Sequence, residues 1–272
     1  MALLDVAYSD YFKSPELGNQ TVVDRTGIQD FQIPRAKLMS CREFLFKYHN
    51  LPAQTAGLGI CDDNRPLLFD LAKPDAGPLL VVGDHECGKT RLLQFMVRTA
   101  IAWNNPAEVK YLVISTKPEE WDTSSLGGSP EYCAGLFGDY EDMATRMINR
   151  MAFLVEQRLS GRQNGPAILL MIDDLLGVEQ MDFEARLNLE WLLHHGPAMQ
   201  VWPIVTLPAQ KALALEPWLN QFTHLVTGWM SKASQEIVGV DEKLGADSLV
   251  PTRQFAAWCN RSWLRFWLPT RE

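Results

Sequence analysis

The sequence predicts an α/β fold with a mostly parallel sheet, helices on both of its faces and an antiparallel hairpin at the carboxyl end. Two observations lead to this prediction. From Leu79 onward, short and nearly continuous apolar runs alternate with longer stretches of helical periodicity, as in parallel strands joined by crossover helices. Near the end of the chain, residues 253–259 and 262–268 have strand-like composition and flank Asn260 and Arg261, which indicates a hairpin.

The bulk composition is that of a folded globular protein. The 272 residues can bury a full core as one large domain, with or without a small accessory, and 47% hydrophobic with 21% charged residues is an ordinary balance. No apolar run approaches the length of about 18 residues that spans a membrane. Residues 1–10 lack the basic start and apolar stretch of a signal peptide. We therefore expect a cytoplasmic protein with no transmembrane segment.

Charge and cysteine content limit the ligands that the chain is expected to bind. A formal net charge of -8 argues against a surface that binds nucleic acid everywhere, although it is compatible with a local basic strip. The cysteines are odd in number and form no CxxC pair, so we expect reduced thiols rather than disulfides or a zinc site. The five are Cys41, Cys61, Cys87, Cys133 and Cys259.

The amino-terminal part of the chain differs from the rest in its mixed polar segments. We predict an N-terminal accessory region over residues 1–56 and the α/β domain over residues 57–272. A helix is expected near residues 36–47. Residues 57–60 and 67–70 are short apolar runs around a turn-forming segment, which predicts a hairpin ahead of the main sheet.

Five apolar runs predict the strands of the parallel sheet, because strands that are covered on both faces lack polar residues. They are residues 79–82, 109–114, 168–172, 204–207 and 225–227. Pro203 cannot donate a hydrogen bond to a neighbouring strand, and we therefore place it at the first position of its strand.

Three helices are predicted between these strands, each with one apolar face toward the sheet. The first covers residues 91–103, and the second and third carry an apolar residue at every fourth position. The repeating residues are Met143, Met147, Met151 and Val155 on the second helix and Phe183, Leu187 and Trp191 on the third. We interpret the methionine stripe as core packing rather than as a ligand surface.

One segment matches the phosphate-binding pattern GxxxxGK[ST] and lies between a predicted strand and a predicted helix, as this loop requires. It consists of Gly83, Asp84, His85, Glu86, Cys87, Gly88, Lys89 and Thr90. Backbone N–H groups of such a loop bind phosphates together with the positive end of the following helix. We predict an ATP site in which Lys89 bridges the β- and γ-phosphates, Thr90 holds Mg²⁺ and Arg91 is the last cofactor-binding residue. A metal cluster at 85–87 is disfavoured, because three adjacent loop residues cannot converge on one ion.

A second apolar strand ends in two carboxylates, Asp173 and Asp174. At the carboxyl edge of the sheet, Asp173 can hold Mg²⁺ through water and accept a hydrogen bond from Thr90. Asp174 then faces the γ-phosphate as the residue that orients the attacking water. Many P-loop motors have the longer glutamate there, so hydrolysis is expected to be slow or weak. The alternative that Asp174 only caps the turn after the strand stays open.

Thr206 ends the next apolar strand and is placed to sense the γ-phosphate or the attacking water. We count it with Lys89 and Asp174 as a catalytic candidate. The alternative is structural, because β-branched residues are common in strands.

The order of these motifs resembles the FtsK/HerA group of P-loop motor ATPases, which includes the ATPase domains of type VII secretion systems. The similarity covers roughly residues 58–269 and implies a RecA-like P-loop NTPase fold. Ser115 to Lys117 is similar to a segment that usually reads Asp-Pro-Lys, with serine in place of the aspartate. Thr206 and Leu207 stand where the group has a Thr-Gln pair. Further similar segments are the hairpin at 57–70, Glu120 with Trp121, the basic helix at 146–159, residues 192–196 followed by 201–206, and the closing segments 245–251 and 263–269.

The resemblance implies self-association into a ring, taken to be a hexamer, or assembly with paralogous ATPase subunits. Such a ring couples ATP hydrolysis to movement of a polymer, and double-stranded DNA is the first candidate. Two alternatives stay open. One is a nucleotide-gated assembly module, in which ATP orders an interface. The other is a type VII-like protein-export ATPase with weak hydrolysis and a protein substrate.

Three further expectations concern these partners. An arginine of a neighbouring subunit is expected to act at the nucleotide, and the candidates are Arg146, Arg150, Arg158 and Arg162. A basic strip after Asp122 or near Lys211 would support DNA as the polymer. The tryptophan-rich carboxyl end could stack bases, but its alternating spacing favours packing at the sheet edge or at a subunit interface.

Overall fold

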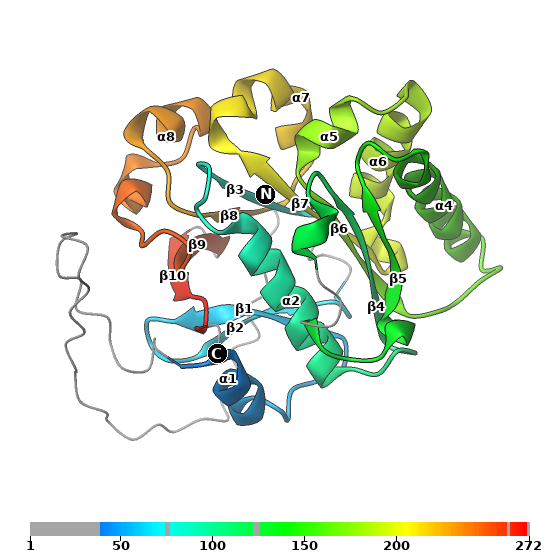
Figure 1. The fold of residues 1–272 in the computed structure, drawn as a ribbon, viewed down its shortest axis with the longest axis horizontal. Coiled ribbons are helices and arrows are strands. Elements are labelled where there is room, and N and C mark those ends of the chain that lie inside the picture. Colours follow the sequence, from blue (N-terminus) through cyan, green and yellow to red (C-terminus); the bar gives the residue numbers. More distant parts are fainter. Residues whose placement is uncertain (1–38, 74–76, 122–125, 260–261, 271–272) are drawn as a thin grey trace.

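The structure, a computed structural model, describes residues 39–73, 77–121, 126–259 and 262–270 (Figure 1). Within these residues ten strands form one sheet in the order β2-β1-β10-β9-β8-β3-β7-β6-β4-β5. The strands are β1 Thr55–Cys61, β2 Pro66–Asp70, β3 Leu79–Gly83, β4 Val109–Ser115, β5 Cys133–Gly138, β6 Ala167–Asp173, β7 Val201–Pro208, β8 His224–Thr227, β9 Gln254–Cys259 and β10 Ser262–Trp267. The α-helices are α1 Cys41–Lys47, α2 Lys89–Trp103, α4 Asp142–Leu159, α5 Leu175–Glu179, α6 Phe183–His195, α7 Glu216–Leu219 and α8 Lys232–Val238.

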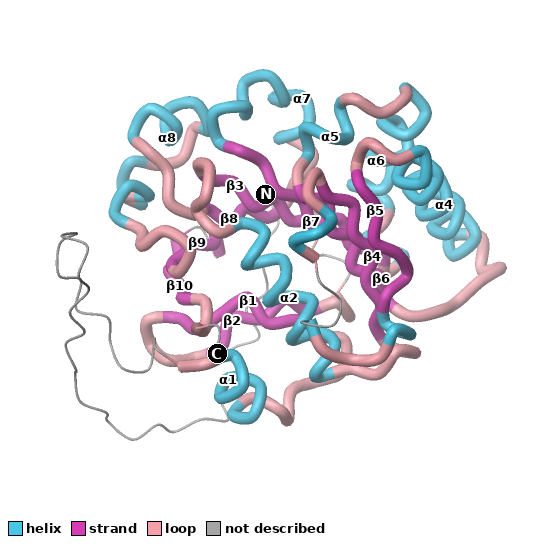
Figure 2. The backbone as a smooth tube through the Cα atoms, viewed as in Figure 1, coloured by secondary structure: helices cyan, strands magenta, loops and turns pink. Residues whose placement is uncertain are grey.

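Six neighbouring strands, β8-β3-β7-β6-β4-β5, run parallel to one another, and helices connect them across both faces (Figure 2). All five strands that the apolar runs predict belong to this half. The sixth, β5, lies at the edge of the sheet and is partly exposed, so it lacks the continuous apolar sequence of the others. The predicted fold class, an α/β sheet that is mostly parallel with a carboxyl-terminal antiparallel hairpin, is confirmed.

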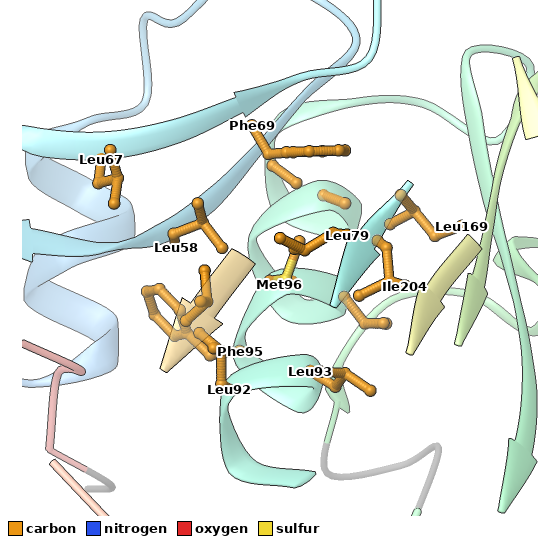
Figure 3. Close-up of a cluster of buried hydrophobic side chains, with 14 of the residues drawn as sticks. Leu58, Leu67, Phe69, Leu79, Leu92, Leu93, Phe95, Met96, Leu169 and Ile204 are labelled. Carbon is orange, nitrogen blue, oxygen red and sulfur yellow. The ribbon is translucent and has the colours of Figure 1, made fainter. Parts of the chain in front are cut away.

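Alternate side chains of the parallel strands enter two separate cores. In β3, Leu79 and Val81 face the core beneath α1 and α2, whereas Leu80 and Val82 face the core on the side of α4 to α8. Figure 3 shows part of the first core, built from Leu58, Leu67, Phe69, Leu79, Leu92, Leu93, Phe95, Met96, Leu169 and Ile204. Because both faces of these strands are buried, they have no polar face in the sequence.

The apolar stripe of the second predicted helix lies largely in the core, as expected. On α4, Met147, Met151 and Val155 are buried, while Met143 in the first turn is 40% exposed. The stripe predicted for the third helix is wrong. On α6, Phe183 is 69% exposed and Leu187 is 48% exposed. The buried face of α6 consists instead of Ala185, Leu189, Leu192 and Leu193. This helix has apolar residues on two faces, so its periodicity alone could not identify the inner one.

Pro203 is not the first residue of its strand, as the sequence suggested, but the third. It pairs with Leu170 of β6 on one side, whereas β3 pairs with β7 only from Ile204 onward. At Pro203 the strand therefore has a neighbour on one side, which removes the need for a hydrogen bond to a second strand.

The carboxyl-terminal hairpin of β9 and β10 is present, but it lies inside the sheet and not at its edge. Strand β9 pairs with β8, and β10 pairs with β1 of the amino-terminal hairpin, both in antiparallel orientation. The sheet-edge position expected for the tryptophan-rich end is wrong, because the β1-β2 hairpin, itself as predicted, extends the sheet beyond β10. Packing of this end at a subunit interface stays a prediction. Trp258 and Trp263 form a cross-strand pair with ring centroids 5.2 Å apart. The turn at Asn260 and Arg261 lies outside the described residues.

Helix α1 is joined to the core of the α/β domain. Ser40 begins it with a capping box, in which the Ser40 hydroxyl accepts from the Glu43 backbone and the Glu43 carboxylate accepts from the Ser40 backbone. Phe44 is fully buried against Phe95 and Trp103 of α2, with ring centroids 5.2 and 5.7 Å away. The rest of the predicted accessory region, residues 1–38, lies outside the described residues, so the division at residue 56 stays a prediction.

The described helices are short or polar relative to a membrane-spanning segment. Over the described parts of the chain, none of them has the length and apolar character needed to cross a bilayer.

Candidate nucleotide site

The phosphate-loop segment forms the turn between β3 and α2. Strand β3 ends at Gly83, and α2 begins at Lys89 with Gly88 as its N-cap in the left-handed conformation, φ 98°. A Cβ at Gly88 would lie 2.7 Å from the Cα of Thr252, and one at Gly83 would lie 2.5 Å from the Sγ of Cys87. Gly88 is therefore required by close backbone approach and by its positive φ, which let such a loop turn its N–H groups toward a phosphate, whereas a side chain at Gly83 would collide with the Cys87 thiol.

The Lys89 ammonium group is folded back onto its own loop. Its Nζ donates hydrogen bonds to the carbonyl oxygens of Gly83 at 3.0 Å and Asp84 at 2.9 Å. These carbonyl groups hold the positive charge at the loop, at the place where the sequence predicts a phosphate.

Asp173 is the point at which three elements meet. Its Oδ2 accepts a hydrogen bond from the Thr90 hydroxyl of α2 at 2.7 Å, and its Oδ1 accepts one from the Thr206 hydroxyl of β7, also at 2.7 Å. The indole N–H of Trp121 donates to Oδ2 at 3.4 Å. Because β6 and β7 are parallel neighbours, their carboxyl ends bring Asp173 and Thr206 to the same edge of the sheet.

Asp174, the second carboxylate, caps helix α5. Its Oδ1 accepts a hydrogen bond from the Leu176 backbone N–H at 2.9 Å. Burial raises the pKa of the Asp174 carboxyl, the charge of Asp173 raises it further, and the Leu176 hydrogen bond and Lys89 act in the opposite direction. The capping alternative for Asp174 thus describes its observed contact, and the side chain nevertheless faces the same cavity as Lys89.

A cavity of about 690 Å³ lies over the loop and brings most of the predicted residues together. The sequence-predicted residues that line it are His85, Glu86, Gly88, Lys89, Thr90, Arg91, Asp173, Asp174 and Thr206. Gly83, Asp84 and Cys87 are not part of its described lining. The Asp84 carboxylate accepts from the Ser231 N–H at 2.9 Å, and the Cys87 thiol is buried beneath the loop.

Arg91 connects α2 to two distant parts of the chain. Its guanidinium donates to the carbonyl oxygen of Thr252 at 3.1 Å and to that of Pro269 at 2.8 Å. It lines the cavity at the same time, so it can contact a nucleotide while it holds the segments that flank the β9-β10 hairpin.

Four arginines were predicted as candidates to act at the nucleotide of a neighbouring subunit, and they differ in how exposed their side chains are. Arg158 is half-buried, donates to the carbonyl oxygens of Met199 at 2.7 Å and Pro166 at 2.8 Å, and so lies near the amino ends of β6 and β7. Arg146, Arg150 and Arg162 have exposed side chains. Asp122 lies outside the described residues, and Lys211 is exposed in the short helix Ala209–Leu215.

Several residues of the site were missed in the sequence. Trp121 is buried and apolar in character, and its role as a donor is visible only when Asp173 lies beside it. Thr252 lines the cavity because its backbone N–H donates to the Cys87 carbonyl oxygen at 2.9 Å, a contact across 165 residues. Gln94 lies one helical turn beyond Thr90 and could have been recognised from that spacing.

The residues present fit a magnesium nucleotide. Mg²⁺ prefers oxygen ligands and is usually bound by one or two carboxylates together with phosphates and waters. The Thr90 hydroxyl and the Asp173 carboxylate supply such oxygens within 2.7 Å of each other. The left-handed Gly88, the start of α2 and the Lys89 ammonium group provide the donors that a polyphosphate requires.

Comparison with known proteins agrees with this geometry. No protein-family model and no curated protein sequence matches the chain. Among solved structures, the cytoplasmic domain of the Thermomonospora curvata type VII secretion ATPase EccC is 18% identical, with a TM-score of 0.63, over 87% of this chain and 28% of that one. ATPases 2 and 3 of the same EccC, in complex with a signal sequence peptide, are 16% identical, with a TM-score of 0.63, over 89% of this chain and 44% of that one.

Two other proteins share the fold. The pCW3 conjugation coupling protein TcpA, in a monomer form with ATPγS, is 15% identical with a TM-score of 0.62, over 85% of this chain and 70% of that one. The DNA-packaging ATPase B204 of Sulfolobus turreted icosahedral virus is 10% identical with a TM-score of 0.52, over 72% and 98%. The chain thus spans less than half of either EccC structure. The resemblance seen in the sequence is confirmed at the level of the fold, which this chain shares with the EccC ATPase domains and with TcpA.

Proposed function

We propose that this chain is an ATP-binding and ATP-hydrolysing motor domain of FtsK/HerA type. The observation that carries the proposal is the pair of 2.7 Å hydrogen bonds from Thr90 and Thr206 to the Asp173 carboxylate, beside the cavity that Lys89 lines. These contacts join the phosphate loop, the carboxylate strand and the next strand around one space. Such a grouping is what a magnesium triphosphate needs.

Each residue has a definite part in this proposal. Thr90 and Asp173 hold Mg²⁺, which supplies positive charge to the phosphate oxygens when it is bound. Lys89 exchanges its two carbonyl partners for phosphate oxygens. Thr206 keeps Asp173 oriented and is near enough to contact the terminal phosphate or the attacking water.

Hydrolysis depends most on Asp174. Its carboxylate lines the same cavity as Lys89 and Thr90, where it can accept a proton from the attacking water. However, its carboxylate is already engaged by the Leu176 N–H, and its side chain is shorter than a glutamate. We therefore propose slow hydrolysis. The hydrogen bond between Leu176 and Asp174 also favours the second candidate function, a nucleotide-gated assembly module in which turnover is incidental.

The proposed assembly is a cytoplasmic ring, taken to be a hexamer, or a complex with paralogous ATPase subunits. Double-stranded DNA is the first candidate for the polymer, and the shared fold with the DNA-packaging ATPase B204 supports it. The alternative is protein export of the type VII kind. That alternative is supported by the likeness to EccC in complex with a signal sequence peptide and by the formal net charge of -8.

One experiment tests both the activity and the polymer. ATPase activity per molecule is measured over a range of protein concentrations, at low salt, with and without duplex DNA. A ring motor gives activity that rises with protein concentration, because the site is completed at a subunit interface. Stimulation by DNA at low salt supports DNA translocation. Activity without stimulation favours protein export, and nucleotide binding without turnover favours the assembly module. Lack of any nucleotide binding would contradict the proposal.

A further inference from the structure

We propose that Lys117 is a second phosphate-binding cation of this site and that it leaves Glu120 for the terminal phosphate when a nucleoside triphosphate is bound. This inference rests on the proposed nucleotide function and deepens it. It predicts that Lys117 and its ion-pair partner Glu120 together let the site distinguish a triphosphate from a diphosphate.

The backbone fixes Lys117 beside the carboxylate strand. In the sheet, Ser115 at the end of β4 pairs with Asp173 at the end of β6. The next N–H, of Thr116, donates to the Asp173 carbonyl oxygen at 2.8 Å, and the Lys117 N–H donates to the Ser115 hydroxyl at 3.1 Å. Parallel neighbours lie about 4.8 Å apart, so the backbone of Lys117 is held close to the carboxylate that is proposed to bind Mg²⁺.

Within the described lining of the cavity there are three permanently cationic side chains, Lys89, Arg91 and Lys117. Arg91 donates to the backbone carbonyls of Thr252 and Pro269, and Lys89 belongs to the phosphate loop itself. Four carboxylates line the same cavity: Glu86, Glu120, Asp173 and Asp174. A triphosphate adds further negative charge, and a cation besides Lys89 and the proposed Mg²⁺ would stabilise its last phosphate. Lys117 is the cationic side chain that can move to meet it.

The present partner of Lys117 is easily exchanged. Its Nζ lies 3.2 Å from Glu120 Oε1, and the two side chains are 59% and 46% exposed. An ion pair as exposed as this contributes little to stability, because water screens both charges. A phosphate in the cavity carries more charge than one carboxylate and can displace it.

Glu120, in contrast, has a fixed support. Its carbonyl oxygen accepts a hydrogen bond from the Gln94 side chain of α2 at 2.8 Å, and its N–H donates to the Lys117 carbonyl oxygen at 3.1 Å. The next residue, Trp121, is buried and donates to Asp173. These contacts fix the backbone of Glu120 at the cavity wall, while the long and exposed lysine side chain is free to change its partner. In the absence of a triphosphate, Lys117 is paired with Glu120.

Binding of two nucleotides to variants of the full chain tests this inference. Dissociation constants are measured by calorimetry, with Mg²⁺, for ADP and for the non-hydrolysable triphosphate AMPPNP. Lys117→Met is expected to weaken AMPPNP binding about tenfold, the usual size of a lost charge-assisted hydrogen bond, and to change ADP binding less than twofold. Glu120→Gln is expected to tighten AMPPNP binding severalfold, because Lys117 is then released. Lys117→Arg keeps the charge and is expected to retain the preference for AMPPNP.

Matched controls separate the possible failures. Lys243→Met removes an exposed charge outside the described cavity lining and is expected to leave both affinities unchanged. If Lys117→Met weakens both nucleotides equally or neither, or if Glu120→Gln weakens AMPPNP, the inference about Lys117 is wrong while the nucleotide site stands. If the unaltered protein binds neither nucleotide, the proposed function fails and this inference fails with it. Thermal melting of each variant checks that it is folded.

Discussion

Thr206 donates a 2.7 Å hydrogen bond to Asp173 Oδ1, and both side chains are buried at the carboxyl edge of the sheet. This contact fixes the plane of the carboxylate, so that the other oxygen faces Thr90 at the start of α2. A residue that was predicted to sense the terminal phosphate thus also orients the proposed metal ligand, and the two roles can be separated by substitution.

Thr206→Val removes the hydroxyl and keeps the β-branched shape, so Asp173 loses one of its charge-assisted hydrogen bonds. We expect the Mg²⁺ concentration for half-maximal ATP binding to rise about tenfold, which corresponds to about 1.4 kcal/mol. Thr206→Ser restores the donor and is the matched control. A Mg²⁺ titration at fixed ATP checks this prediction, and an unchanged midpoint in the valine variant would show that Thr206 does not orient the ligand.

Lys89→Ala is expected to abolish binding of Mg-ATP. The ammonium group is the cation of the phosphate loop, and in the free protein it already bridges the carbonyl oxygens of Gly83 and Asp84. Calorimetric titration with ATP measures the loss. Lys243→Met serves as the control for the change in net charge. Equal affinity of the Lys89 variant and the unaltered protein would remove the basis for a nucleotide site in this loop.

The parts of the site that lie within one short segment could be predicted from the sequence. The parts that depend on contacts between distant segments could not. Asp173 ends an apolar strand, and Lys89 and Thr90 begin the helix that follows the loop after another, so their positions follow from strand order. Trp121 and Thr252 join the site through contacts with Asp173 and Cys87 that no short sequence pattern records. The parallel half of the fold was predictable for the same reason, because its buried strands are continuous apolar runs.

Two wrong predictions about the fold have related causes. The alternating spacing of the tryptophan-rich end favoured the sheet edge or a subunit interface. The pairing of this end with β1 was not visible in the sequence, because it joins residues about 200 positions apart, Ile60 and Trp267. The inner face of α6 was misassigned because Phe183 and Leu187 repeat as regularly as the residues that are buried. In both places the local periodicity correctly predicted the type of element, a strand pair or a helix. It did not determine which other elements pack against it.

Substitutions at Trp121 compare how much its apolar packing and its indole hydrogen bond each contribute to stability. The indole is buried in the core beneath α2, and its N–H donates to Asp173 at 3.4 Å. Trp121→Phe keeps most of the apolar contacts and is expected to lower the free energy of unfolding by about 1 kcal/mol. Trp121→Ala leaves a large cavity and is expected to cost about 3 to 5 kcal/mol. Urea denaturation of both variants measures the difference, and similar losses would mean that the side chain is not packed as described.

His224, at the start of β8, predicts how stability depends on pH. Its ring is buried, meets Phe69 edge-on at 6.4 Å, and neither of its ring nitrogens has a hydrogen-bond partner in the described structure. Burial lowers the pKa of this imidazole from its usual value of 6.5 to about 4. Above pH 6.5 the ring is neutral in both the folded and the unfolded chain, so it imposes no penalty. As the pH falls from 6.5 toward 4, the unfolded chain takes up a proton that the folded chain does not, and unfolding becomes more favourable.

Between pH 7 and pH 4.5 this residue alone is therefore expected to lower the free energy of unfolding by about 2 to 3 kcal/mol. Carboxylates titrate in the same range, and a variant without the imidazole separates their contribution. His224→Phe retains an apolar ring of similar size and is expected to lose about 2 to 3 kcal/mol less than the unaltered protein over that interval. Urea denaturation at the two pH values measures both losses. Equal losses in the two proteins would mean that His224 takes up its proton in the folded chain near its usual pKa, and that it is not enclosed by the sheet in solution.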